Sequence, residues 1–80
     1  MAEVDEMIRR EIEGDPTINV KALTVAIRHK GAIPRRHFLH VGGIAQTEHD
    51  KNQVERIARH HTGDAYTVIS EVTIREREDA

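Results

Sequence analysis

Six histidines are the residues best suited to chemistry in this chain, because an imidazole both binds metals and carries protons. A helical zinc pair needs two histidines four residues apart on one face. His37 and His40 are three apart in a predicted strand and so point to opposite faces, while His60 and His61 are adjacent in a predicted helix. We expect no metal site. His61 is interpreted as a half-buried residue at the edge of the core, and a pH-responsive patch around His37 and His40 stays open.

No serine or threonine of the sequence lies in a pattern typical of a catalytic nucleophile. The single serine, Ser70, lies in a predicted strand, and the threonines lie in turns, helix caps or strands rather than in a nucleophile elbow. The chain has no cysteine, which excludes disulfides, thiolate zinc sites and thiol catalysis. Gly42-Gly43 lacks the third glycine of a dinucleotide-binding fingerprint. We therefore expect no catalytic residue, no cofactor and no enzymatic activity.

Basic residues crowd into one short segment of ten positions, namely Arg28, His29, Lys30, Arg35, Arg36 and His37. One interpretation is a site for an anionic partner, either phospholipid headgroups or nucleic acid. The other is a solvated loop in a chain with twelve lysines and arginines. A net charge of -2 and a scarcity of aromatic rings disfavour nucleic acid. The solvated loop is the favoured interpretation, and if the segment binds a partner, anionic lipid or a membrane surface is the expected one.

Length and composition predict one small domain, residues 1–80, with a core from about 4 to 75 and a frayed tail at 76–80. Aliphatic side chains must build the core, since there is no tryptophan and only one phenylalanine and one tyrosine. The charged, amphipathic start is not typical of a secretory signal, and no apolar run reaches the roughly 18 residues of a membrane span. The expected location is cytoplasmic, or periplasmic if the chain is excised from a longer one.

Hydrophobic periodicity predicts five elements in the order α-β-β-α-β. The expected helices are Glu3–Glu13 and Glu48–His61, and the expected strands are Ala22–Arg28, His37–Gln46 and Ala65–Arg75. The first two strands should form an antiparallel hairpin, and a helical crossover allows the third to run parallel to the second. Each helix has one apolar stripe. The predicted fold is therefore α+β, with two helices packed on one face of a three-stranded mixed sheet.

The join between the second strand and the second helix is the most specific local pattern. Gly42-Gly43 lies inside the strand, where glycine marks a bulge or a close backbone approach, here expected to be the approach of a helix. Thr47 is a favourable N-cap with Asp50 three residues on, and Gly63 ends the helix. These residues are expected to be structural.

Strand alternation predicts a second surface. If Leu39 and Val41 face the helices together with Val68 and Val72, then Phe38, His40 and Ile69 face away. Two large apolar groups on a face that should be solvated suggest a patch covered by another copy, another domain or a lipid. Scattered apolar residues are also normal on protein surfaces, so both interpretations stay open.

The order of these motifs resembles the BON domain, a small bacterial domain named for osmotic-stress and nodulation proteins. The resemblance covers about Val4 to Ile74. It is carried by the first strand (Leu23, Val25, Ile27), the turn glycine Gly31, the strand-two signature Leu39-His40-Val41-Gly42-Gly43, the helix (Val54, Ile57, Ala58), Gly63, and the last strand (Val68, Val72, Ile74). The chain departs from the family pattern in the extra hairpin residues Ala32 to Arg36 and in Asp64 after Gly63.

The resemblance implies a non-catalytic module that binds membranes or other hydrophobic ligands. Two hypotheses follow. In the first, the module binds phospholipid through Arg28, Lys30, Arg35 and Arg36 with adjacent apolar residues. In the second, it is an assembly module that pairs with another copy or domain through Phe38, His40 and Ile69 on the open sheet face, or through the edge of the first or third strand.

Overall fold

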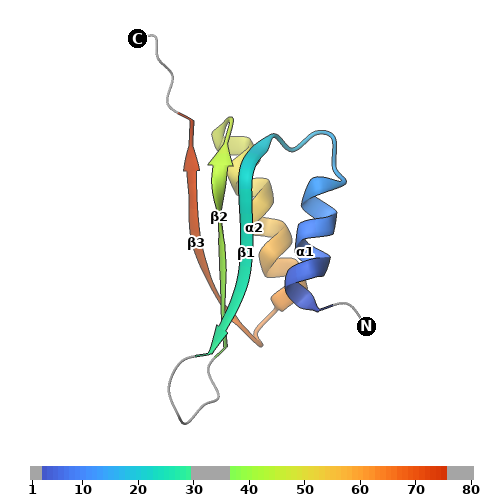
Figure 1. The fold of residues 1–80 in the computed structure, drawn as a ribbon, viewed down its shortest axis with the longest axis vertical. Helices are drawn as coiled ribbons and strands as arrows, with labels where there is room; N and C mark the ends of the chain where they lie inside the picture. Colours follow the sequence, from blue (N-terminus) through green and yellow to red (C-terminus); the bar gives the residue numbers. More distant parts are fainter. Residues whose placement is uncertain (1–2, 30–36, 76–80) are drawn as a thin grey trace.

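The chain folds into two layers, a sheet and a pair of helices (Figure 1). The computed structural model describes residues 3–29 and 37–75. Its elements are α1 (Val4–Glu13), β1 (Val20–His29), β2 (His37–Ala45), α2 (Glu48–Thr62) and β3 (Thr67–Ile74). The predicted α+β class and element order are confirmed, and each boundary lies within two residues of its predicted position.

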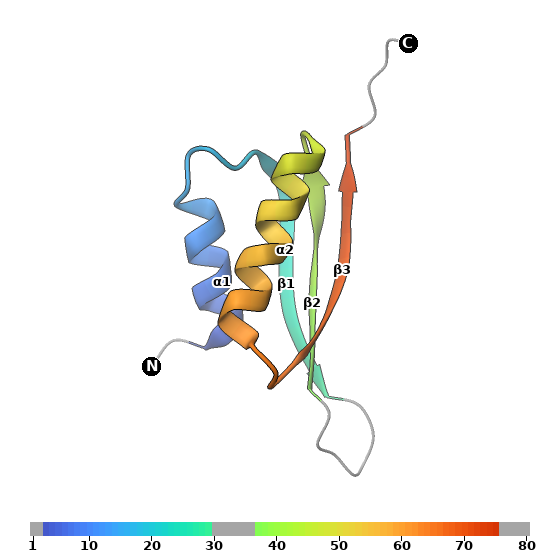
Figure 2. The ribbon, with the colours of Figure 1, turned by 180° about the vertical axis from the view of Figure 1, so that it is seen from behind.

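The sheet is mixed and has the strand order β1-β2-β3. β1 and β2 are antiparallel neighbours along the hairpin, whereas β3 runs parallel to β2 because the intervening helix α2 carries the chain back. Figures 1 and 2 show α1 and α2 side by side on one face of the sheet. Within the described residues, no helix or strand covers the opposite face. This layering confirms the predicted arrangement.

The core lies between the helices and the sheet and is aliphatic. Ile8 and Ile12 from α1, Leu39 and Val41 from β2, and Val54 from α2 are the largest fully buried side chains. They meet because α1 presents positions four apart and β2 presents positions two apart toward the same layer. A buried Leu or Ile contributes about 1.5–3 kcal/mol relative to an exposed one, so these five account for much of the stability of the small domain.

β1 is longer than the alternation predicted, which corrects the expected start at Ala22 and the assignment of His29 to a loop. The ladder runs from Val20 opposite Ala45 to His29 opposite His37, with a shift of register between Lys21 and Thr24. Ala22 has a φ of 54° at this bulge. The bulge allows both Val20 and Leu23 to pack against the core. In a regular strand these residues, three apart, would point to opposite faces. An extra residue between them restores the alternation.

Gly42 and Gly43 allow close approach of a neighbouring strand. This corrects the expectation that Gly43 allows close approach of a helix. A β-carbon at Gly43 would lie 3.1 Å from the Lys21 carbonyl oxygen and 3.3 Å from the Leu23 α-carbon, both on the bulged part of β1, and Gly43 has a φ of 148°. A β-carbon at Gly42 would lie 2.9 Å from the Thr24 hydroxyl oxygen. The glycines therefore allow β1 to come close to β2 at the bulge.

The N-terminus of α2 is capped as predicted and is also tied to the start of β1. The Thr47 hydroxyl oxygen accepts a hydrogen bond from the Asp50 backbone N–H and donates one to the Asp50 carboxylate. The other Asp50 oxygen accepts from the backbone N–H of Asn19 at 3.2 Å. Asp50 is 4% exposed. A local cap thus becomes a long-range contact, which the capping pattern alone could not indicate.

Candidate interaction surface on the open face of the sheet

The strand register arranges the side chains on the face of the sheet opposite the helices in four rows, the farthest from the hairpin containing Lys21, Ile44 and Thr73. The register aligns Ala26, His40 and Ile69 across the three strands in the central row. One row nearer the hairpin, Arg28 aligns with Phe38. Because β2 alternates, Leu39 and Val41 enter the core while Phe38 and His40 face away from the helices. The predicted outward orientation of Phe38, His40 and Ile69 is confirmed.

These side chains surround a shallow depression, which we call the open face. It is lined by Thr24, Ala26, Arg28, Phe38, His40, Ile69 and Glu71. Ala26, Phe38, His40 and Ile69 are only half exposed although no described element covers them. They are therefore shielded by one another. Ala26, Phe38 and Ile69, which surround His40, are called the apolar centre of the face.

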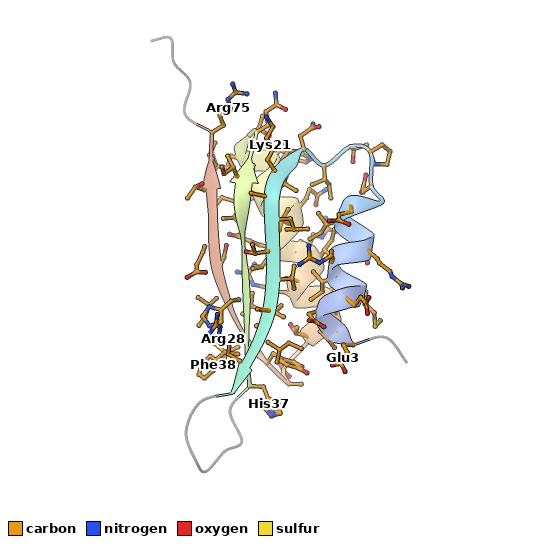
Figure 3. All side chains as sticks on the ribbon, in the orientation of Figure 1. Glu3, Lys21, Arg28, His37, Phe38 and Arg75 are labelled. Carbon is orange, nitrogen blue, oxygen red and sulfur yellow. The ribbon has the colours of Figure 1, made fainter. Side chains whose placement is uncertain are left out.

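Opposite charges lie at two corners of the open face. Arg28 stands on β1 in the row nearest the hairpin, and Figure 3 shows it beside Phe38. Glu71 stands on β3 in the row on the far side of the centre, aligned with Gly42 and Thr24. The Glu71 carboxylate lies 3.9 Å from Nδ1 of His40. The face thus presents an apolar centre between a cationic and an anionic corner.

Only part of the predicted basic segment belongs to this surface. Arg28 lines the open face. Lys30, Gly31, Arg35 and Arg36 lie outside the described residues. His37 faces the opposite side of β2 from Phe38, and its ring centroid lies 5.5 Å from that of Tyr66.

Several residues of the surface escaped the sequence analysis. Thr24, Ala26 and Glu71 line the depression, and Ile44, two residues beyond Gly42 on the same side of β2, is 43% exposed. The signal was present in the alternation: once Phe38 and His40 face away, so do Gly42 and Ile44. Which residues of β1 and β3 join them depends on the register, and the bulge in β1 shifts it.

A polar cluster on the helix side of β3 was also missed. The Ser70 hydroxyl donates a hydrogen bond to the Glu55 carboxylate at 2.5 Å, and Nζ of Lys51 lies 2.9 Å from the same oxygen. The Glu55 side chain is 12% exposed. The Ser70 hydrogen bond is the largest cause that holds the pKa of Glu55 below its ordinary value, against the effect of burial, and Lys51 and Arg59 add to it.

This cluster is structural. A carboxylate whose pKa is lowered is a weak general base for a serine hydroxyl. Lys51 pairs with the carboxylate and not with Ser70, so it does not act as the base either. The Ser70–Glu55 hydrogen bond joins the outer strand β3 to α2, and the Lys51 ion pair compensates the charge of the carboxylate.

The histidines form no metal centre in the part of the chain that the structure describes: among residues 3–29 and 37–75, no three histidine, aspartate or glutamate side chains gather closely enough to hold an ion. Nε2 of His61 lies 2.6 Å from a Glu11 carboxylate oxygen and so joins α2 to α1. His61 is half-buried at the edge of the core, as predicted. Its neighbour His60 is exposed.

Neither described helix is long and apolar enough to cross a membrane. Comparisons with family models, with curated proteins and with solved structures find no match to this chain. The resemblance to the BON domain therefore stays a prediction that rests on the residues themselves.

Proposed function

We propose that this protein is a non-catalytic interaction module of the BON type that binds a protein partner through its open face. The observation that carries the proposal is the uncovered apolar centre formed by Ala26, Phe38 and Ile69 around His40, across three adjacent strands. A sheet with one face packed on helices and the other face free is stable alone, and the free face is normally polar. Here three apolar side chains and one histidine occupy its middle, and apolar and aromatic groups are enriched in interface cores.

The charges of the open face favour a protein partner over a membrane. A membrane-binding surface gathers several cations that approach anionic headgroups together. The open face instead carries Arg28 at one corner and Glu71 at the other. Opposite charges around an apolar centre suit a partner with complementary charges, which fixes orientation as well as affinity.

Phospholipid binding is the second candidate. It is favoured by the position of Arg28 and Phe38, which lie side by side at the hairpin end of the sheet, next in sequence to the other basic residues. A cation beside an aromatic ring is a suitable anchor at a membrane surface. In this alternative the protein would bind by the hairpin end rather than by the centre of the open face.

Phe38→Ser tests the proposal, with Met7→Ser as the matched control, since Met7 is 40% exposed on α1 and lies away from the open face. Sedimentation velocity over a range of concentrations measures self-association, and circular dichroism checks the fold. We expect Phe38→Ser to weaken association and Met7→Ser to leave it unchanged. Measurable self-association of equal strength in wild type and Phe38→Ser would refute a role for the open face.

Vesicle co-sedimentation separates the second candidate. Vesicles of phosphatidylglycerol and phosphatidylcholine are compared with vesicles of phosphatidylcholine alone, at low and high salt. Headgroup binding through Arg28 would require the anionic lipid and would weaken steeply with salt, because screening acts on exposed charges. If the partner is a protein, the amount of protein that co-sediments with vesicles should be the same for the two lipid compositions.

A further inference from the structure

We infer that the partner of the open face is the open face of a second copy of this chain, related by a twofold axis that passes beside His40. This inference rests on the proposed function and specifies the partner. It is carried by the position of two charges, Arg28 and Glu71, relative to the apolar centre between them.

Arg28 and Glu71 occupy diagonally opposite corners of the open face. Arg28 is on β1, one row from the central row toward the hairpin, and Glu71 is on β3, one row from it in the other direction. His40, on β2 in the central row, lies midway between them. With strands about 4.8 Å apart and rows about 6.8 Å apart, the backbones of Arg28 and Glu71 are separated by about 16 Å, too far for a pair within one chain.

A twofold axis in the plane of the interface allows Arg28 and Glu71 to pair between two copies. If the axis lies perpendicular to the line from Arg28 to Glu71 and passes beside His40, it places each Arg28 opposite the Glu71 of the other copy. Two ion pairs form at once, as an isologous interface requires. The two sheets then cross steeply, which is the orthogonal class of sheet packing.

The same axis also matches the apolar groups. Phe38 lies on the hairpin side of His40, and Ile69 lies beside His40 on β3. Rotation about the axis brings Phe38 of one copy over Ile69 of the other, and the reverse contact follows by symmetry. Charge pairing and apolar contact therefore favour one and the same arrangement. An axis along the line from Arg28 to Glu71 would instead place Arg28 against Arg28 and Glu71 against Glu71.

The size of the surface predicts a weak, reversible dimer. Three strands over the length of the face offer about 500 Å² per copy, but sheets that cross steeply overlap over only part of this length, so the total buried area is less than about 1,000 Å², below the size of standard specific interfaces. Such a dimer forms at high protein concentration, or when each chain is held near another.

Charge reversal tests the geometry. Arg28→Glu places an acid opposite each Glu71, and Glu71→Arg places a cation opposite each Arg28, so each variant alone should self-associate more weakly by about tenfold or more. In an equimolar mixture, a dimer of the two variants has opposite charges at both contacts, one pair in the original orientation and one inverted. Sedimentation equilibrium should show that the mixture associates as tightly as wild type. The double variant Arg28→Glu/Glu71→Arg should recover association by itself.

Matched controls are Arg56→Glu and Asp64→Arg, at exposed positions on α2 and in the turn that follows it. We expect both, alone or mixed, to associate like wild type. The inference is overturned if the mixture of open-face variants associates no better than each variant alone, or if wild type stays monomeric at about 1 mM, well above the Kd of even a weak specific interface. If Phe38→Ser still weakens association while mixing fails, the twofold geometry is wrong and the open face remains the interaction surface.

Discussion

The hydroxyl of Ser70 on β3 donates a hydrogen bond to the carboxylate of Glu55 on α2, with 2.5 Å between the two oxygens. β3 is an outer strand of the described sheet, and it is paired there with β2 on one side only. This bond therefore attaches the outer strand to the helix layer, and Lys51, on the same helix as Glu55, pairs with the carboxylate that accepts it. Because the carboxylate is largely buried, each of its partners affects stability.

Ser70→Ala should lower the free energy of unfolding by about 1–3 kcal/mol, because it removes a hydrogen bond to a charged and largely buried group. Urea denaturation followed by circular dichroism measures the change. Thr67→Ala, at an exposed position of the same strand, serves as the control and should change stability little. A loss that is equal in the two variants would show that β3 responds to any truncation and that the contact with Glu55 is not special.

Acid should weaken the domain through Glu55. The pKa of Glu55 is lowered from 4.5 in the folded protein, chiefly by the Ser70 hydrogen bond, so the unfolded chain binds its proton more readily. The stabilisation is complete above pH 4.5 and is lost as the pH falls through the lower folded pKa.

The comparison of wild type with Glu55→Gln across this range isolates the effect. The difference in unfolding free energy should shrink as the pH falls below 4.5. The pKa of Asp15 is also lowered, by hydrogen bonds from Thr17. Because Asp15 is present in both proteins, its contribution to the pH dependence cancels in the difference. A difference that stays constant with pH would contradict the assigned shift.

Asp50→Ala should cost about 1–3 kcal/mol, since it removes the carboxylate that binds both the Thr47 hydroxyl and the Asn19 backbone N–H. Thermal unfolding gives the loss. Asp64→Ala, at an exposed position after α2, is the control. Hydrogen exchange at the Asn19 amide distinguishes the long-range bond from simple capping: it should accelerate in Asp50→Ala more than in Thr47→Ala.

Gly43→Ala should be more damaging than Gly42→Ala. At Gly43 the backbone has a φ of 148° and a new β-carbon would meet backbone atoms of β1, which cannot move aside, so a loss on the order of 2–4 kcal/mol is expected. At Gly42 the obstacle is the Thr24 hydroxyl, a side-chain group, and the loss should be about 1–2 kcal/mol.

Thr24→Ala provides the internal check. The double variant Gly42→Ala/Thr24→Ala should be more stable than Gly42→Ala alone, because the obstructing hydroxyl is gone. Thr24→Ala should not restore Gly43→Ala. If Thr24→Ala restored the stability of both glycine variants, the backbone of β1 at the bulge would have to move aside, contrary to the expectation for Gly43→Ala.

The candidate surface could be predicted only along β2. Alternation places Phe38 and His40 on the same side of one strand, and this was correct. Arg28 and Glu71 come from different strands, and their diagonal placement depends on how β1 and β3 pair with β2. A shift of one residue would move either charge to the other face. Periodicity within one strand carries no information about that pairing.

Local patterns in the chain predict the five elements, their order and the apolar stripes that bury Ile8, Leu39 and Val54, because periodicity, caps and breakers are local and repeat along the chain. They do not predict four features that depend on packing: the bulge at Ala22, the close approach of Gly43 to β1, the hydrogen bond between Asp50 and Asn19 and that between Ser70 and Glu55. Each of these joins residues that are distant in sequence or depends on strand register. Such contacts follow from how elements pack, which no local pattern specifies.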